Sequence, residues 1–427
     1  MDKAQSLSLN AEQSDALYHL SSHQNVFVTG AAGSGKSFLI KYFQKQLTKP
    51  LPIVASTGAA AVIVGGCTFH SFFSLGIMKG GLEKTIERAL KDKRLLKRLK
   101  KTSAIIIDEI SMIDPEAFYA AEQICRYALD PDLPFGGLKI IAVGDFFQLP
   151  PVQKAGHRFW LFQTTVWKQM DFKVIHLQEI MRTQDTDFIQ ALNYIRFGIC
   201  NEYVHDFFSS KGLTNTKDFE GTVLFGHRYK VDEFNQHKLA QIPGSIFTYN
   251  TEVSIKKKST LTEERVMQMS PLPPSIQLKK GALVMIRKNH PDGLYVNGTL
   301  GHVKDLTSED VTVKTLEDQV FIFSKDEFEI LNADNEVSAT ITNLPLTLAW
   351  ASTIHKAQGA SIDRVCVDLS GFWEKGQAYV ALSRAKSSEG LFVNNWDPKY
   401  IRADSRVSQY YETLDRKNTS EVVSDHI

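Results

Sequence analysis

Hydrophobic and polar positions alternate in blocks along the first part of the chain. Short, almost wholly apolar runs fall at 25–30, 52–57, 103–109 and 138–145, and longer amphipathic stretches separate them. Continuous apolar runs of this length are typical of strands buried on both faces, and the stretches between them have the spacing of helices. The pattern predicts βαβ units on a parallel sheet, that is, an α/β domain over residues 1–175.

The pattern changes twice after about residue 175. A helical spacing at 187–198 and a β-type run at 221–227 predict the start of a second α/β lobe, and a similar pattern returns at 344–369. Between them, charged and proline-containing loops alternate with short strands, which favours a small β-rich insertion. The predicted units are a second lobe at 176–230 and 341–403, an inserted module at 231–340, and a polar, frayed tail at 404–427.

Amino-acid composition says less about the class of protein than the hydrophobic pattern does. The 427 residues include 49 basic and 48 acidic side chains, so any nucleic-acid surface must be a local patch. No apolar run approaches the roughly 18 residues of a membrane span, and the start lacks the features of a signal peptide. The four cysteines are far apart in the chain, which favours reduced thiols. We expect a cytoplasmic protein without a membrane segment.

One basic patch is visible in the sequence. Residues 84–101 combine many basic side chains with leucines at positions 90, 95, 96 and 99. This spacing predicts an amphipathic helix, and the commonest role of such a basic face is simply to be solvated. The sequence alone assigns it no partner.

The string GAAGSGKS at 30–37 has the composition and context of a phosphate-binding loop. It follows a β-type run, leads into a helical pattern, and its small residues let backbone N–H groups approach phosphate oxygens. Lys36 would supply positive charge to the β and γ phosphates, and the Ser37 hydroxyl would bind Mg²⁺. A glycine-rich turn that binds nothing is the alternative, which this context disfavours. The backbone groups concerned are those of Gly33, Ser34 and Gly35.

Two acidic residues end the apolar run IIIDE. Asp108 and Glu109 would lie at the carboxyl end of a strand, where ligands bind in open α/β sheets. Asp108 would hold Mg²⁺, and Glu109 would activate the attacking water. An acidic pair at this point also caps helices, but its combination with the upstream loop favours the catalytic interpretation.

ATP hydrolysis needs further groups around the triphosphate. Gln13, about twenty residues before the loop, has the side-chain amide that matches adenine. Arg182 and Arg384 are candidates to stabilise the negative charge that develops on the γ-phosphate. The alternatives are a plain surface position for Gln13 and a surface ion pair for each arginine.

Several strings resemble the petite-integration-frequency (Pif) helicases of superfamily one: IIIDEISMID, PFGGLKIIAVGDFFQLPPV, STIHKAQGASIDRV and AYVALSRAK. The motifs span about residues 9–386 in the family's order. The resemblance implies two RecA-like P-loop lobes with ATP in the cleft between them and single-stranded DNA across both. It also implies an ATP-driven DNA helicase that moves from 5′ to 3′, which neither periodicity nor spacing reveals.

The resemblance also assigns roles residue by residue. Gln13 matches the adenine-reading glutamine, Gln148 matches the residue that senses the γ-phosphate, and Gly359 is added as a nucleotide contact. Arg182 and Arg384 match the arginines that complete the site from the second lobe, so that ATP would clamp the lobes together. For the phosphate loop and the acidic pair, the implied roles are those given above.

For single-stranded DNA, the resemblance implies contacts from hydroxyl, aromatic and basic side chains, which suit phosphate contact and base stacking. Phe72 has a second interpretation as a buried core residue, and His355 has one as an interior histidine. The full set comprises Thr57, His70, Ser71, Phe72, Thr353, His355 and Lys356.

The resemblance extends to accessory elements and partners. Residues 281–303 resemble a small SH3-like insertion, and a strand-separating hairpin is placed loosely within 66–90. The implied partners are single-stranded DNA, forked duplex DNA and, as a further candidate, G-quadruplex DNA, bound by a monomer. Three alternatives stay open: a RecD-type or phage-type helicase, a P-loop ATPase switch, and a nuclease or integrase subunit.

Overall fold

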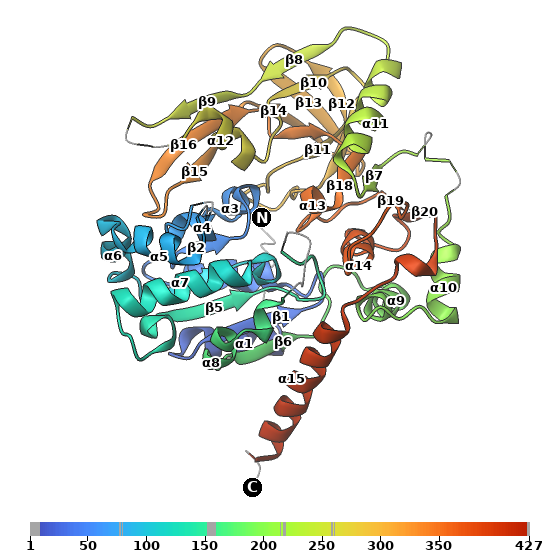
Figure 1. Ribbon diagram of the computed structural model, residues 1–427. Coiled ribbons are helices and arrows are strands. Elements are labelled where there is room, and N and C mark those ends of the chain that lie inside the picture. The colour runs from blue at the N-terminus through green and yellow to red at the C-terminus, as the bar shows by residue number, and fades with distance from the viewer. Residues whose placement is uncertain are drawn as a thin grey trace, which may run out of the picture.

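The computed structural model of the protein shows two α/β lobes and a β-rich module inserted in the second lobe. In Figure 1 the first lobe runs from blue to teal, the second is green and red, and the yellow-to-orange module lies above both. The described residues are 9–424, apart from 77, 79, 152–158, 214, 217–218, 258 and 260. Residues 1–8 of the predicted first domain and 425–427 of the predicted tail lie outside them.

The centre of the first lobe is a six-stranded parallel sheet. Its strands are β1 (Val26–Gly30), β2 (Ile53–Ala55), β3 (Cys67–Thr68), β4 (Ala104–Ile107), β5 (Lys139–Val143) and β6 (Lys173–Leu177). The helices are α1 (Ala11–Ser21), α2 (Lys36–Gln46), α3 (Gly58–Val64), α4 (Phe69–Phe72), α5 (Leu82–Leu90), α6 (Lys93–Leu99), α7 (Pro115–Ala128) and α8 (Thr165–Gln169). The fold class is therefore the predicted one.

Both faces of this sheet are covered, which explains why the central strands β1, β4 and β5 are almost wholly apolar. Val26 and Val28 of β1 pack in a core with Leu39 of α2, whereas Phe27 packs in a second core with Phe118 of α7. The strand order is β3-β2-β4-β5-β1-β6, so β4, β5 and β1 are neighbours. The loops that follow these three strands consequently meet at one edge of the sheet, where parallel α/β folds bind ligands.

The second lobe has a four-stranded parallel sheet in the order β18-β7-β19-β20. These strands are β7 (Thr222–Phe225), β18 (Ala351–Thr353), β19 (Val365–Asp368) and β20 (Leu391–Asn394). Its helices are α9 (Thr186–Arg196), α10 (Glu202–Ser209), α11 (Arg228–Gln241), α13 (Ile354–Ala357) and α14 (Gln377–Leu382). The predicted boundary at residue 231 falls inside α11, which packs on β7 and β18. This helix has few buried apolar positions, Val231 and Leu239 among them, so the hydrophobic pattern did not predict it.

The inserted module is built from antiparallel sheets. A five-stranded sheet has the order β14-β13-β12-β11-β17, a three-stranded one β15-β16-β9, and β10 pairs with β8. The elements are β8 (Phe247–Asn250), β9 (Glu252–Ile255), α12 (Glu263–Met269), β10 (Ser275–Leu278), β11 (Leu283–Ile286), β12 (Leu300–Leu306), β13 (Asp310–Thr315), β14 (Val320–Ser324), β15 (Asp326–Leu331), β16 (Val337–Asn343) and β17 (Leu346–Leu348). Because β17 pairs with β11, the module extends past the predicted boundary at residue 340. Its SH3-like character stays a prediction.

In the described part of segment 66–90 no antiparallel strand pair occurs, and a strand-separating element within this segment stays a prediction. β3 lies parallel to β2 in the main sheet, and helices α4 and α5 occupy much of the remainder. The apolar residues of the segment serve the core: Phe69, Phe72 and Phe73 are fully buried. The aromatic side chains at the start of this segment therefore contribute to the core of the lobe.

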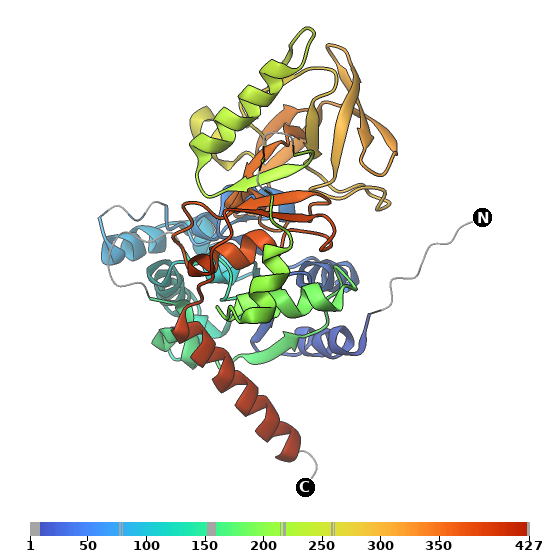
Figure 2. The same ribbon diagram turned by 90° about the vertical axis from the view of Figure 1, so that its right-hand side faces the viewer.

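The prediction of a frayed tail is wrong for Ser405–Ser424, because these residues form helix α15. Val407 and Tyr411 are buried, and Tyr410 and Leu414 pack against the same core. These residues have the i, i+3, i+4, i+7 spacing of an amphipathic helix, which the polar residues between them obscure. Figures 1 and 2 show the helix leaving the two lobes at its carboxyl end.

The sequence also predicted that the chain has no membrane-spanning segment and that its cysteines are reduced thiols. Within the described ranges, no helix combines the length and the apolar character that crossing a bilayer requires. All four cysteines are free thiols, as the sequence predicted.

Candidate nucleotide site and DNA surface

The phosphate loop has the predicted strand–loop–helix geometry, since β1 ends at Gly30 and α2 begins at Lys36. Gly33 and Gly35 have φ angles of +86° and +88°, which glycine adopts far more readily than other residues. A Cβ at Gly33 would also lie 2.7 Å from the Cβ of Arg182. The loop therefore needs glycine both for its backbone conformation and for the close approach of an arginine.

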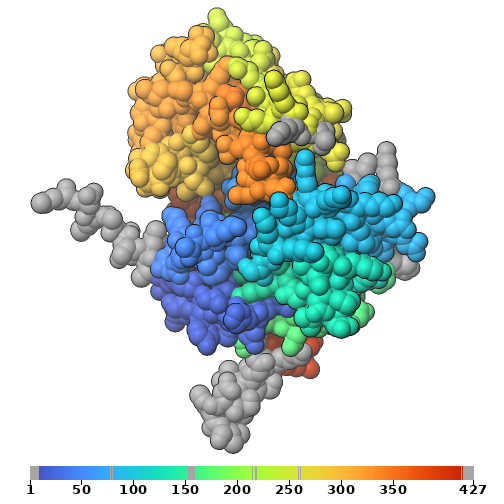
Figure 3. Space-filling model, turned by 90° about the vertical axis from the view of Figure 1, so that its left-hand side faces the viewer, coloured from blue at the N-terminus to red at the C-terminus, as the bar shows by residue number. Residues whose placement is uncertain are grey.

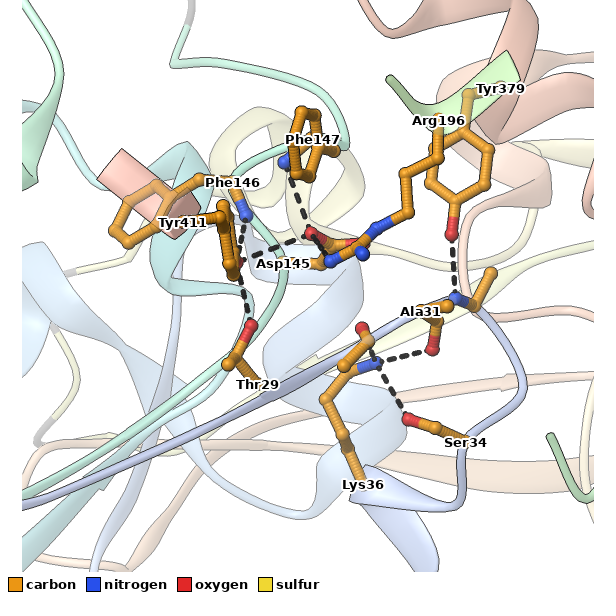
Figure 4. Close-up of polar contacts among 12 residues, drawn as sticks. Thr29, Ala31, Ser34, Lys36, Asp145, Phe146, Phe147, Arg196, Tyr379 and Tyr411 are labelled. Atoms are coloured by element: carbon orange, nitrogen blue, oxygen red, sulfur yellow. Dashed lines mark hydrogen bonds and ion pairs between the residues drawn. The ribbon is translucent and has the colours of Figure 1, made fainter. Parts of the chain in front are cut away.

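Lys36 is folded back on its own loop (Figure 4). Its Nζ donates hydrogen bonds to the carbonyl oxygens of Gly30 (2.8 Å) and Ala31 (2.9 Å). Burial lowers the pKa of Lys36 to about 8, although the nearby carboxylates of Asp145 and Glu109 oppose this shift. Phosphate oxygens would offer this ammonium group better acceptors than the neutral carbonyls that it contacts here.

The acidic pair follows β4 directly. The backbone N–H of Glu109 donates to Oδ1 of Asp108 at 3.0 Å. Burial raises the pKa of both groups, and the pKa of Glu109 reaches about 7 because the charge of Asp108 adds to the effect of burial. Glu109 also has a φ of +51°, an uncommon conformation for this residue type that is found at functional sites. The loop after β4 thus holds a carboxyl group whose pKa burial raises to about 7.

Arg182 lies at the loop, and Arg384 is near enough to Arg182 and Glu109 for their charges to interact. Arg182, in the segment after β6, packs on Gly33 and donates from Nη1 to the carbonyl of Ser383. Arg384 follows α14, is 2% exposed, and donates to the oxygen of Val380 (2.8 Å) and to Oγ of Ser383 (2.9 Å). Burial lowers the pKa of each arginine, that of Arg182 to about 9, and the two positive charges oppose each other. Neither arginine is a surface ion pair.

Of the remaining predicted nucleotide residues, Gln13 and Gln148 are buried, whereas Ser37 and Gly359 are exposed. Gln13 is buried, and its Nε2 would lie 2.7 Å from a Cβ at Gly35, so it borders the loop. Gln148 is buried after β5, and its carbonyl would lie 3.0 Å from a Cβ at Gly376 of the second lobe. Ser37 is exposed at the start of α2. Gly359 is exposed after α13 with open space around its Cβ position, and the neighbouring Gln358 lies close enough to Glu109 to lower the pKa of that carboxyl group, so the nucleotide contact of Gly359 stays a prediction.

Sequence reasoning missed a buried ion pair beside the loop. Asp145, after β5, accepts two hydrogen bonds from Arg196 of α9, Nε to Oδ2 at 3.1 Å and Nη2 to Oδ1 at 2.9 Å (Figure 4). Burial opposes ionisation, but the Arg196 guanidinium holds the pKa of Asp145 below its usual range. The aspartate lies in the quoted string GDFFQLPP, whereas nothing in the sequence marks Arg196. The pair joins the first lobe to the second.

Sequence reasoning also missed two tyrosines, Tyr411 and Tyr379, whose hydroxyl groups form hydrogen bonds at the end of β1 and in the phosphate loop. The hydroxyl of Tyr411, on α15, lies 2.6 Å from Oγ1 of Thr29 and accepts from the N–H of Phe146 at 3.2 Å. The hydroxyl of Tyr379, on α14, accepts from the N–H of Ala32 at 2.8 Å. Figure 4 shows the two hydroxyl groups approaching the loop from different sides. Three separate segments of the chain are therefore packed around the phosphate loop.

The DNA residues expected from the motifs are mostly exposed. Thr57 caps the amino end of α3 directly after β2, and Thr353 caps α13 directly after β18, so the two lobes present equivalent helix starts. His355 and Lys356, in the first turn of α13, are exposed. His355 is consequently not the interior histidine of the alternative interpretation.

The TFHSFF segment fits the DNA prediction less well. Ser71 is exposed and His70 is half-buried, with a pKa that burial lowers. Phe72 is fully buried, with its ring 5.0 Å from that of Phe73 and 5.2 Å from the guanidinium of Arg98. The prediction that Phe72 contacts DNA is wrong for this arrangement, because a side chain without exposed surface cannot stack on a base.

Comparison with known proteins identifies the family. A family model described as PIF1-like helicase matches residues 8–205. The ATP-dependent DNA helicase Pif1 of Bdellovibrio bacteriovorus is 44% identical over 413 residues, which are 96% of this chain and 93% of that protein. The chain belongs to the PIF1-like helicase family. It is therefore an ATP-dependent DNA helicase, an enzyme that hydrolyses ATP, as the motifs implied.

Solved Pif1 structures have the same architecture. A Bacteroides sp. Pif1 in complex with ADP-AlF4 is 30% identical, with a TM-score of 0.84 over 96% of this chain and 98% of that one. Bacteroides Pif1 bound to ssDNA is 29% identical and has the same coverage, but its TM-score is 0.66. The domain arrangement of this PIF1-like helicase is thus nearer to the first of these structures than to the second.

Proposed function

We propose that this PIF1-like helicase moves along single-stranded DNA from 5′ to 3′ by closing its two lobes around ATP and reopening them after hydrolysis. One observation carries the proposal. Lys36 and Glu109 of the first lobe and Arg182 and Arg384 of the second surround a single phosphate loop. A triphosphate bound there would be held by cations from both lobes.

Each side chain has a distinct part in this cycle. Lys36 holds the β and γ phosphates, Glu109 takes a proton from the attacking water, and Gln148 senses the γ-phosphate. Arg182 and Arg384 stabilise the charge that develops in the transition state. Before nucleotide arrives, their charges repel each other, so an anion between them relieves an existing repulsion. Release of phosphate removes the anion that Lys36 and the two arginines share across the lobes, which favours reopening.

The residues present also fit Mg²⁺. Burial raises the pKa of Asp108, whose carboxylate would be stabilised by a nearby cation, and Ser37 is accessible at the start of α2. In the described part of the chain no three histidine, cysteine, aspartate or glutamate side chains cluster as ligands. Asp108 and Ser37 would therefore share the ion with phosphate oxygens and water, which suits Mg²⁺. The bound ion would neutralise charge on the phosphates.

DNA would lie across the equivalent helix starts of the two lobes. Thr57 on one side, and Thr353, His355 and Lys356 on the other, supply hydroxyl, imidazole and ammonium groups for phosphate contact. A Bacteroides Pif1 structure is bound to ssDNA, and another Pif1 structure concerns DNA unwinding at forked dsDNA by two coordinating helicases, which supports the same partners here. G-quadruplex binding, a monomeric state and a place at the nucleoid in the cytoplasm are further proposals drawn from the family resemblance.

A strand-displacement assay tests the direction of movement. Duplexes with only a 5′ tail should be unwound, and duplexes with only a 3′ tail should not, because the motor must load on the strand along which it moves. Lys36→Ala is the matched control: it should bind the 5′-tailed substrate like the parent but neither hydrolyse ATP nor unwind. Preferential unwinding of the 3′-tailed duplex would contradict the proposal, and a hydrolysing Lys36→Ala protein would contradict the site.

A further inference from the structure

A basic groove lies between the first lobe and the inserted module. Its volume is about 1510 Å³, and its walls come from α2, α6, the start of β2 and the turn between β15 and β16. Figure 3 shows the orange part of the module resting on the blue and cyan parts of the first lobe on this face. None of the residues assigned above to ATP hydrolysis lines this groove.

Positive charge is concentrated here far beyond the average for the chain. Nine lysine and arginine side chains line the groove against two carboxylates, whereas the whole protein carries a net charge of only +1. The basic run of the sequence contributes through α6, whose Leu95 and Leu99 are buried while Lys97 is exposed toward the groove. Such local concentration of one sign is typical of a surface that binds a polyanion.

Basic side chains line the groove from both of its walls. Lys41 and Lys45 come from α2, and Lys256 comes from the loop after β9 in the module. Arg98 of α6 forms an ion pair with Asp334 of the β15–β16 turn at 2.8 Å and donates to the carbonyl of Phe72 at 2.7 Å. This contact fixes the module wall against the first-lobe wall and gives the groove a defined shape.

Aromatic side chains lie among these cations. Phe38 and Tyr42, one turn apart on α2, are half-buried with ring centroids 6.2 Å apart, and both line the groove. Basic side chains that follow a backbone, together with aromatic rings that accept bases, are the two components of a single-strand binding groove. A duplex offers no unstacked bases to these rings, so the lining favours single-stranded DNA.

The groove is separate from the proposed motor track. Thr57 follows the carboxyl end of β2, whereas the groove reaches Pro52 and Ile53 at the amino end of the same strand. It also meets α3 at Val64, the end opposite to Thr57, which is about 10 Å away for a helix of this length. One strand held at Thr57 and Thr353 therefore leaves the groove free for another.

We propose that this groove is a second site for single-stranded DNA, which holds the strand of a fork that the motor does not occupy. Separation of a duplex produces two single strands, and only one of them passes over the motor. The groove would keep the other strand away from its complement. Binding to this site requires no ATP, so it is tested independently of the hydrolysis mechanism.

The experiment compares DNA affinities of the full chain without nucleotide. Lys97→Glu with Lys101→Glu reverses two charges that line the groove, and Lys93→Glu with Lys100→Glu is the matched control outside the lining on the same stretch of chain. The parent and the control should bind forked DNA at least fivefold more tightly than either single-tailed duplex. The groove variant should lose this preference, and the logarithmic salt slope for the fork should fall by about 1.4 for two lost contacts.

Photocrosslinking locates the strands directly. Forks carrying 4-thiothymidine in one tail at a time should attach one tail to peptides near Thr57 or Thr353, and the other to peptides containing Tyr42 or Lys97. Attachment of both tails only to the motor peptides would overturn the proposal. So would an equal preference for forks in the groove variant and its control, provided that both melt at the temperature of the parent.

Discussion

The nucleotide cleft and the DNA surface use similar side chains in opposite surroundings. Arg384 is 2% exposed, and burial shifts the pKa of Lys36 and Glu109 toward neutrality. Lys356 and Thr57, in contrast, are exposed, although partial burial also lowers the pKa of Lys356. Charges interact more strongly where water is excluded, so each cleft residue has a large effect on its neighbours. The comparison indicates that catalysis depends on a few enclosed groups, whereas DNA affinity is distributed over many weak contacts.

The largest effect should come from removing an enclosed arginine. Arg384→Ala should lower the ATP turnover rate by about 10³-fold or more with little change in ATP affinity, since such arginines act on the transition state. Steady-state hydrolysis with saturating single-stranded DNA measures this. Arg228→Ala, which removes an exposed arginine from the second lobe, is the control and should be close to the parent. Similar rates for the two variants would remove Arg384 from the site.

A smaller effect should appear when pH is varied. Glu109 must be ionised to accept a proton, so kcat/KM should rise as pH increases through about 7, the pKa that burial gives this group. Lys36 must be protonated to hold phosphate, so kcat/KM should fall again as pH passes about 8. The profile should be a narrow bell, with about a tenfold loss per pH unit on either side. A flat profile between pH 6 and 9 would contradict the proposed roles.

The smallest effect should come from the exposed surface. Lys356→Ala should weaken single-stranded DNA binding on the order of fivefold at low salt and lower the salt slope by about 0.7, the value for one phosphate contact. ATP hydrolysis at saturating DNA should change little. Fluorescence anisotropy at several salt concentrations provides the measurement, with the exposed Lys304→Ala as the matched control on the module. If Lys356→Ala changed ATP turnover more than DNA affinity, the assignment of Lys356 to the DNA surface would be contradicted.

Local patterns predicted the elements that carry the chemistry. Asp108 and Glu109 follow an apolar run, and the phosphate loop joins a strand to a helix, so both could be placed without knowing the strand order. The strand order β4-β5-β1 then brings these loops together. Short-range sequence features were sufficient here because the phosphate loop and the acidic pair each follow a strand directly.

Contacts between distant segments could not be predicted in this way. Arg196 pairs with Asp145 across 51 residues, and Tyr411 reaches Thr29 across 382. No spacing rule connects such positions, since their meeting depends on how the lobes pack. Phe72 shows the converse difficulty: its motif indicated DNA, but burial decides what a side chain can contact, and burial is a property of the whole fold.

The docking of α15 has a mechanical consequence. The chain passes from the first lobe to the second after β6 and returns when Tyr411 packs beside Thr29. The second lobe is consequently attached to the first at both of its ends, in addition to the Asp145–Arg196 pair and the Arg98–Asp334 contact of the module. Any movement that separates the lobes must therefore either keep Tyr411 beside Thr29 or break that contact, so the terminal helix limits how far the second lobe can move away from the phosphate loop.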